Sequence, residues 1–312
     1  MKIIFLGSDN FAVAPLKALV STGHDICLVV TQPDRKKGRG MRLLPTAFKE
    51  SAQGLKLKLF QPSDINCDDS IRFLKGFSPD IFVVIAYGQK LSPAVLSIPK
   101  IMALNVHASL LPKYRGAAPI NWAIINGETK TGNSLMKIAP EMDAGAVIMQ
   151  KEMDILGSDT AVSMAEKLSF DGASLLAEGI EAIKNGKYDL KEQDRAKVSF
   201  APKLKKTDGL INWERSAPEI NDLVRGCLNW PGAFTYYKGR ILKIFSSKAV
   251  KEETAHDFGL PGQVISTSDR MLTIATGKGD LSISELQLEG KKRMSTEEFI
   301  RGNKISAGEK LG

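Results

Sequence analysis

Cysteine is scarce in this sequence. The 312 residues include only Cys27, Cys67 and Cys227, which lie far apart. They form no CxxC pair and no cluster with histidine, which a zinc site or a disulfide-stapled domain requires. The sequence therefore predicts neither a metal site nor a disulfide framework. Reduced, structural thiols of this kind are typical of a protein of the cytoplasm.

Long apolar runs are also missing. No stretch of about 18 apolar residues occurs without a charged side chain, although a membrane-spanning helix needs about 20. The N-terminal run Met1–Gly7 contains one lysine and no small-residue cleavage site, so it predicts a first strand rather than a signal peptide. With 43% hydrophobic and 25% charged residues, the composition is that of a globular protein. We expect no membrane partner and a cytoplasmic location.

Positive charge is in moderate excess and is locally concentrated. The formal net charge is +8, from 43 Lys and Arg against 35 Asp and Glu. Such an excess is compatible with a nucleic-acid partner, although many basic proteins bind none. Two segments are especially basic, and their cationic residues are Arg35, Lys36, Lys37, Arg39 and Arg42 in the first and Lys203, Lys205 and Lys206 in the second. The first segment fits phosphate contacts with RNA, and a solvated charged loop is the alternative.

The first half of the chain alternates short apolar runs with helical patterns. Runs of this kind, without polar residues between them, are typical of strands buried on both faces of a sheet. We expect strands at 3–6, 26–31, 55–60, 80–86 and 102–106. Strands that alternate with helices predict an α/β fold with a doubly wound, mostly parallel sheet. Ligands bind such sheets beyond the carboxyl ends of the strands, at the switch point.

The pattern changes after about residue 190. Before it, we expect a short helix at 117–126, extended segments at 133–138 and 146–155, and a long helix at 160–183. A polar stretch follows, and then a helix at 217–227 and several short strands punctuated by Gly and Asp. Short strands at this spacing predict a second, smaller β-barrel domain. The expected boundaries are a first domain at 1–189, a linker at 190–207 and a second domain at 208–312.

The first strand-to-helix turn is poor in glycine. Gly7–Phe11 lies where a dinucleotide-binding fingerprint would be, but it has one of the three glycines that the fingerprint needs. This argues against a bound NAD or FAD, and we interpret the segment as a tight structural turn.

Asn105 and His107 are the most informative polar pair. They end a buried strand at positions i and i+2, so both side chains point to the same face. An amide donor beside an imidazole can stabilise a developing oxyanion, and the imidazole can move a proton at neutral pH. A structural histidine whose hydrogen bonds are satisfied within the fold is the alternative interpretation.

Asp143 lies in a glycine-containing turn between two extended segments. An acidic residue in such a turn is usually solvated or makes an Asx turn. A catalytic role requires that the fold bring it to His107, where a carboxylate would orient the imidazole and favour its charged form. Sequence spacing alone does not establish this contact.

Six segments together resemble a known family. They are 3–8 with Phe11, Thr31–Arg35 with Gly38–Gly40, Val84–Gly88, Asn105–His107 with Ser109–Gly116, Asp143–Gly145, and Asn229–Ala233. These segments are similar to those of the folate-dependent formyltransferases, and the similarity extends over essentially the whole chain. The basic loop and the C-terminal β domain favour the members of the family that act on an aminoacyl-tRNA.

The resemblance implies a Rossmann-like formyltransferase domain followed by an OB-like barrel that binds tRNA. It implies transfer of the formyl group of 10-formyltetrahydrofolate to the α-amino group of methionine on initiator methionyl-tRNA, with no metal and no obligate protein partner. The catalytic trio would be Asn105, His107 and Asp143. Folate would bind at Ser109, Leu110, Leu111, Pro112, Tyr87 and Gly88. The two basic segments would contact tRNA, with Arg39 reaching the acceptor end.

Two other functions remain open from the sequence. One is a formyltransferase that acts on an amino-sugar nucleotide or another small amine, since such enzymes share the Asn-x-His and Ser-Leu-Leu-Pro patterns. The basic loop at 35–42 argues against it, because a small substrate needs no extended cationic segment. The other is a non-catalytic RNA-binding protein, against which the intact trio argues.

Overall fold

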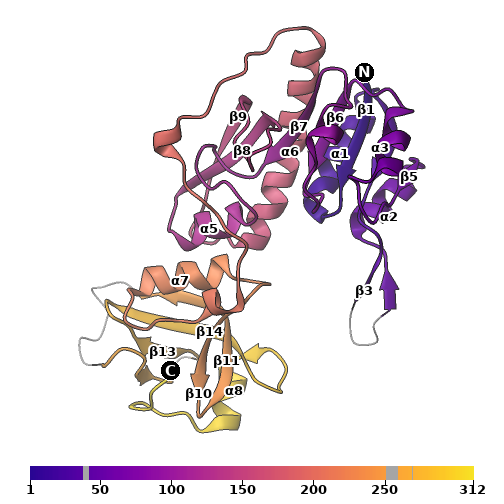
Figure 1. The fold of residues 1–312 in the computed structure, drawn as a ribbon. Coiled ribbons are helices and arrows are strands. Elements are labelled where there is room, and N and C mark those ends of the chain that lie inside the picture. The colour runs from indigo at the N-terminus through magenta and orange to yellow at the C-terminus, as the bar shows by residue number, and fades with distance from the viewer. Residues whose placement is uncertain (38–41, 251–258, 269) are drawn as a thin grey trace. The chain divides into compact units, whose positions relative to one another are not determined.

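The computed structural model describes residues 1–37, 42–250, 259–268 and 270–312, and it divides into two compact units (Figure 1). Unit 1 comprises residues 1–116, 130–154 and 165–201. Unit 2 comprises residues 117–129, 155–164 and 202–312. In the described part of the chain, no helix has both the length and the apolar character needed to span a membrane.

A seven-stranded sheet forms the centre of unit 1, in the order β5-β2-β1-β6-β7-β8-β9. Its strands are β1 (Lys2–Gly7), β2 (Asp25–Val30), β5 (Leu59–Phe60), β6 (Ile81–Ile85), β7 (Met102–His107), β8 (Lys130–Lys137) and β9 (Val147–Asp154). The first five strands in that order are parallel, and β8 and β9 pair antiparallel. The predicted doubly wound, mostly parallel sheet is confirmed.

Helices cover both faces of this sheet. Ile3 and Phe5 of β1 pack in one apolar cluster and Ile4 and Leu6 in another, because successive strand residues point to opposite faces. The first cluster includes residues of α1 (Val13–Ser21), α2 (Ala47–Gly54) and α6 (Ala161–Lys184), and the second includes residues of α3 (Asp68–Lys75) and α4 (Pro93–Leu96). Burial on both sides explains why the strands are uninterrupted apolar runs in the sequence.

The first basic segment contains regular structure that the sequence does not predict. The backbone of β3 (Arg35–Lys37) pairs antiparallel with β4 (Arg42–Leu44). Lysine and arginine are not enriched in strands as β-branched and aromatic residues are, so the segment resembles a loop in the sequence. Arg39 lies outside the described residues.

Unit 2 is built on an antiparallel sheet in the order β10-β11-β14-β13-β12, with β15 paired to β14. Its strands are β10 (Ala233–Tyr237), β11 (Arg240–Ala249), β12 (Val264–Ser266), β13 (Leu272–Ala275), β14 (Asp280–Leu288) and β15 (Met294–Ser295). The sheet confirms the small β domain. It is a curled half-barrel and not a closed barrel, because its order runs from β10 at one edge to β12 at the other. Helix α8 (Thr296–Asn303) is an additional element that the sequence analysis does not predict.

Two short segments from the middle of the chain belong to unit 2. Helix α5 (Pro119–Ile125) packs against α7 (Ala217–Gly226), where a Cβ on Gly226 would lie 2.5 Å from Ile125 Cγ1. Asn121 Nδ2 donates a hydrogen bond to Gly226 O (2.8 Å), and Arg225 Nη1 donates to Asp159 O (2.5 Å). The ranges predicted from the sequence treat each domain as continuous, whereas these contacts join distant parts of the chain.

Candidate active site

Strand β7 brings Asn105 and His107 to the carboxyl edge of the parallel strands. Asn105 is paired with Val84 of β6, and His107 is paired with Ser134 of β8. The His107 side chain is buried, whereas Asn105 is partly exposed. Within the described part of the chain, the Asn105 amide has no hydrogen-bond partner. Its N–H groups are therefore available to a ligand.

The His107 ring is held from two sides. Its Nε2 lies 2.9 Å from the Tyr114 carbonyl oxygen, and since a carbonyl only accepts, Nε2 carries a proton. Its Nδ1 faces Asp143, 3.7 Å from Oδ2. That distance is within ion-pair range but exceeds a direct hydrogen bond. Nδ1 is therefore the ring nitrogen whose lone pair is free to accept a proton.

The structure brings Asp143 to His107, as a catalytic role requires. Asp143 adopts a left-handed backbone conformation (φ +51°), and its Oδ2 accepts a hydrogen bond from the Gly116 N–H at 2.9 Å. Gly116 itself has φ +129°, and a Cβ there would lie 2.5 Å from Ala201 O. Only glycine fits this approach, so the donor that orients the carboxylate depends on it.

The Ser109–Pro112 segment is braced by the two antiparallel strands. Ser134 of β8 donates its hydroxyl to Ser109 O (2.6 Å) and accepts the Leu111 N–H (3.0 Å). Gln150 of β9 donates to Leu111 O (2.9 Å). These bonds fix the backbone that follows His107.

The side chains of this segment differ in their access to a ligand. Ser109 is fully buried and donates to Lys113 O (2.7 Å), and Leu111 is buried against Met136 and Val147. Leu110 and Pro112 are partly exposed. The predicted folate contacts of Ser109 and Leu111 would therefore come from backbone atoms, and the role of the segment stays a prediction.

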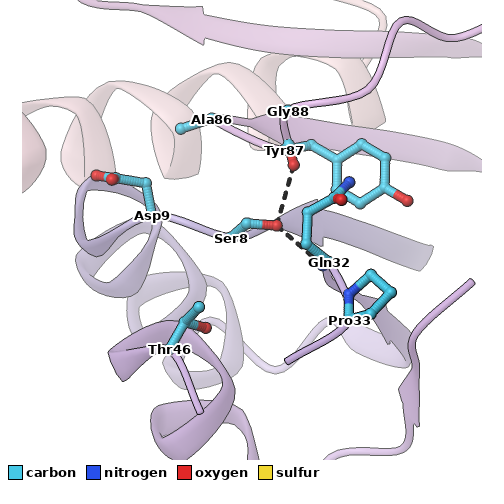
Figure 2. A pocket seen from close by; sticks show the side chains of 8 residues that line it. All are labelled: Ser8, Asp9, Gln32, Pro33, Thr46, Ala86, Tyr87 and Gly88. Atoms are coloured by element: carbon cyan, nitrogen blue, oxygen red, sulfur yellow. Dashed lines mark hydrogen bonds between the residues drawn. The ribbon is translucent and has the colours of Figure 1, made fainter. Parts of the chain in front are cut away.

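A pocket of about 270 Å³ lies at the carboxyl ends of β1, β2 and β6 (Figure 2). Its lining residues are Ser8, Asp9, Gln32, Pro33, Thr46, Ala86, Tyr87 and Gly88. Ser8 Oγ donates to Tyr87 O and accepts the Gln32 N–H, both at 3.0 Å, so one hydroxyl joins the three strand ends. The chain order reverses between β1 and β6, which makes this the switch point of the sheet.

Tyr87 lines the pocket, but its ring extends away from Asp9 and Thr46 and ends in a buried hydroxyl (Figure 2). The side chain is 2% exposed, and its hydroxyl has no hydrogen-bond partner among the residues described. Burial raises the pKa of the phenol, so it stays protonated and able to donate. The structure thus places Tyr87 and Gly88 in a pocket, together with Ser8 and Gln32, which the sequence analysis does not select. A polar residue directly after a buried strand is the signal that could have identified Ser8.

The second basic segment lies in unit 2 beside an exposed aromatic residue. Lys203, Lys205 and Lys206 are exposed, and none of them forms an ion pair with a described residue. The Trp230 indole, 57% exposed, donates from Nε1 to Leu204 O at 3.4 Å. An aromatic face next to free cations is a typical nucleic-acid contact, and the sequence interpretation does not select Trp230. The cationic side chains of residues 35–37 and 42 are not part of the described structure.

The described side chains offer no evident metal site. Within residues 1–37, 42–250, 259–268 and 270–312, no three His, Cys, Asp or Glu side chains are arranged to hold a metal ion.

Both halves of the chain match formyl transferases in comparisons with known proteins. Residues 1–180 match the formyl transferase family, and residues 203–304 match the C-terminal domain of formyl transferases. The chain is 44% identical over 312 residues to a methionyl-tRNA formyltransferase of Pelotomaculum thermopropionicum (100% of this chain, 99% of the relative). It is 42% identical over 312 residues to that of Citrifermentans bemidjiense (100% and 96%).

A solved structure supports the fold. An N-formyltransferase of Helicobacter canadensis, crystallised with folinic acid and dTDP-3-aminofucose, superposes with a TM-score of 0.68 at 18% identity (94% of this chain, 100% of that chain).

Proposed function

The chain belongs to the formyl transferase family, and from this membership we propose that it transfers the formyl group of 10-formyltetrahydrofolate to the α-amino group of methionine on initiator methionyl-tRNA. It is a formyl-transferring enzyme of translation. The observation that carries this conclusion is identity of 42–44% over the full length to relatives named for this reaction. The amino-sugar alternative has weaker support, from sequence patterns shared by the whole family and from a similar fold at 18% identity.

We propose that His107 acts as the base through Nδ1. Nε2–H is committed to the Tyr114 carbonyl, so Nδ1 is the nitrogen that takes the proton from the attacking amine. The imidazolium that forms lies 3.7 Å from the Asp143 carboxylate, which stabilises its charge. The same proton then passes to the folate nitrogen that leaves.

Asn105 would stabilise the oxyanion of the tetrahedral intermediate. Its amide has no partner in the described part of the chain and extends from the same face of β7 as His107. Once protonated, His107 Nδ1–H is a second donor to the same oxygen. A donor aimed at a developing oxyanion is typically worth about 10²–10³ in rate.

The formyl donor is a substrate in this reaction. We propose that it binds along Ser109–Pro112 and toward Tyr87 and Gly88. Support comes from the braced backbone of the first segment and from the switch-point pocket, which Tyr87 and Gly88 line.

We propose that tRNA contacts the basic residues Arg35, Lys36, Lys37, Arg39 and Arg42 in unit 1 and Lys203, Lys205 and Lys206 in unit 2. Trp230 adds an aromatic face beside the second group. We further propose that the enzyme works in the cytoplasm, where it would encounter both substrates. We also propose that it needs no obligate protein partner.

The function is tested by giving the purified protein labelled 10-formyltetrahydrofolate and either methionyl-tRNA or a panel of small amines that includes amino-sugar nucleotides. We expect label to appear on methionyl-tRNA. Transfer to a small amine alone would overturn the proposal in favour of the alternative, and tRNA binding without transfer would favour the non-catalytic one.

A further inference from the structure

We propose that Gln193, in the polar segment after α6, is a positioning residue that holds Asp143 against His107. The sequence predicts a linker here, but residues up to 201 belong to unit 1. The inference rests on the proposed function of the trio and adds a fourth residue to it.

Gln193 uses its whole side-chain amide on the active-site loops. Its Nε2 donates to Asp143 O and to Gly145 O, each at 2.8 Å. Its Oε1 accepts from Arg115 Nε at 2.9 Å. Both amide hydrogens thus bond to the two carbonyls that flank Ala144, and the oxygen bonds to the loop that follows His107.

Within the turn, the backbone at Asp143 depends on the Gln193 hydrogen bonds more than the backbone at Gly145 does. At Gly145 the backbone is already fixed by close packing, because a Cβ there would lie 1.7 Å from Lys137 O. Asp143 has a positive φ (+51°), a conformation that costs free energy unless the surrounding structure holds it, and its neighbour Met142 is 67% exposed. The Gln193 bonds therefore hold the left-handed peptide that aims the carboxylate.

Gln193 also fixes the donor that the carboxylate accepts from. Arg115 is buried (6% exposed), and its Nη1 lies 3.5 Å from Glu141 Oε1. The next residue, Gly116, donates its N–H to Asp143 Oδ2. One glutamine therefore contacts both sides of the Gly116–Asp143 hydrogen bond: the Asp143 backbone through its NH₂ group and the Arg115 side chain through its oxygen.

The segment around Gln193 is itself anchored. Lys191 exchanges two backbone hydrogen bonds with Val147 of β9, at 2.8 and 2.9 Å. Further along, Arg115 N donates to Ser199 O (2.9 Å), and Ala201 N donates to Arg115 O (2.7 Å). The glutamine thus projects from a backbone held at both ends, as a positioning residue requires.

A double-mutant cycle tests the proposal in the full-length enzyme. We expect Q193A to lower kcat for formyl transfer about 10²-fold, the cost of misplacing a catalytic group by about 1 Å, with KM for both substrates nearly unchanged. In a D143A background the same change should alter kcat less than about threefold, because the group that it positions is gone. An equal loss in both backgrounds, or no loss in the first, would overturn the proposal.

Two further variants separate positioning from loss of packing. Q193E keeps an acceptor for Arg115 but has no N–H for the two carbonyls, so we expect a loss of kcat like that of Q193A. A Q193E enzyme with full kcat would contradict the proposed bonds. The matched control is E192Q at the neighbouring exposed position, which should behave as wild type.

Hydrogen exchange of the Gly116 amide gives a readout that does not depend on activity. Its bond to Asp143 should protect it in the wild type, and Q193A should exchange faster there while β1 and β6 stay protected. If the wild type failed to formylate methionyl-tRNA, the proposed function would fall, but the exchange result would still decide whether Gln193 positions Asp143. Unchanged Gly116 protection in Q193A would refute it.

Discussion

The charge of Asp143 should be worth about three orders of magnitude in turnover. Its Oδ2 lies 3.7 Å from His107 Nδ1, and the imidazole becomes cationic only as the amine loses its proton. Two unit charges at that distance attract by about 4.5 kcal/mol at an effective dielectric constant of about 20. Since each 1.36 kcal/mol is tenfold in rate, D143N should lower kcat about 10³-fold.

The assay is steady-state formyl transfer to methionyl-tRNA, which gives kcat and the KM of both substrates. Asparagine has the same shape as aspartate and keeps an oxygen for the Gly116 N–H, so KM should change little. E152Q, which removes an exposed carboxylate on β9 that pairs with Lys130, is the control for charge alone. A D143N enzyme within tenfold of wild type would refute the electrostatic role of Asp143.

Three other outcomes are expected. N105A should lower kcat about 10²–10³-fold with folate binding intact, and near-normal turnover would remove Asn105 from the mechanism. The double variant K205A/K206A should weaken tRNA binding. It should also reduce the slope of the logarithm of the binding constant against the logarithm of salt concentration by roughly one for each phosphate that is no longer neutralised, and an unchanged slope would exclude both lysines as phosphate ligands. Burial, and next the charge of the N-terminus, lower the pKa of His24 below 6.5, so its protonation disfavours the fold. This contribution to the free energy of unfolding is fully present above about pH 6.5 and is lost as the pH drops through the folded pKa. Urea unfolding of wild type and H24Q at pH 7 and pH 5 measures it. We expect the free energy of unfolding to fall less between these pH values in H24Q, and equal falls would contradict this.

The sequence predicts the sheet well because its strands are buried on both faces. Ile3–Leu6 is an unbroken apolar run, and the structure divides these residues between two clusters. The paired strands β3 and β4 escape prediction because their basic residues carry no strand signal. Helix α8 also escapes it, although Ser295 caps the helix and Glu298 completes a capping box, which is a signal that the sequence does contain.

The candidate site can be predicted only in part. The two-residue spacing of Asn105 and His107 places them on one face of a strand end, which depends on local geometry alone. The approach of Asp143 depends on a left-handed turn and on the Gly116 donor, and neither can be inferred from spacing. Gln193 lies in a polar stretch without periodicity, so its three hydrogen bonds leave no pattern by which to be recognised.

The packing of α5 on α7 limits how the chain can be divided. The backbone passes between the two units at 116/117, 129/130, 154/155, 164/165 and 201/202. A fragment that ends at residue 201 would keep α5 but lose α7, and would expose the Asn121 amide and the Ile125 side chain that pack there. Grafting the C-terminal domain of a relative onto this chain would therefore require its matching α5 and 155–164 segments as well. Because the segments of the two units are interleaved in the sequence, a single crossover point in a chimeric gene would not exchange one whole unit for that of a relative.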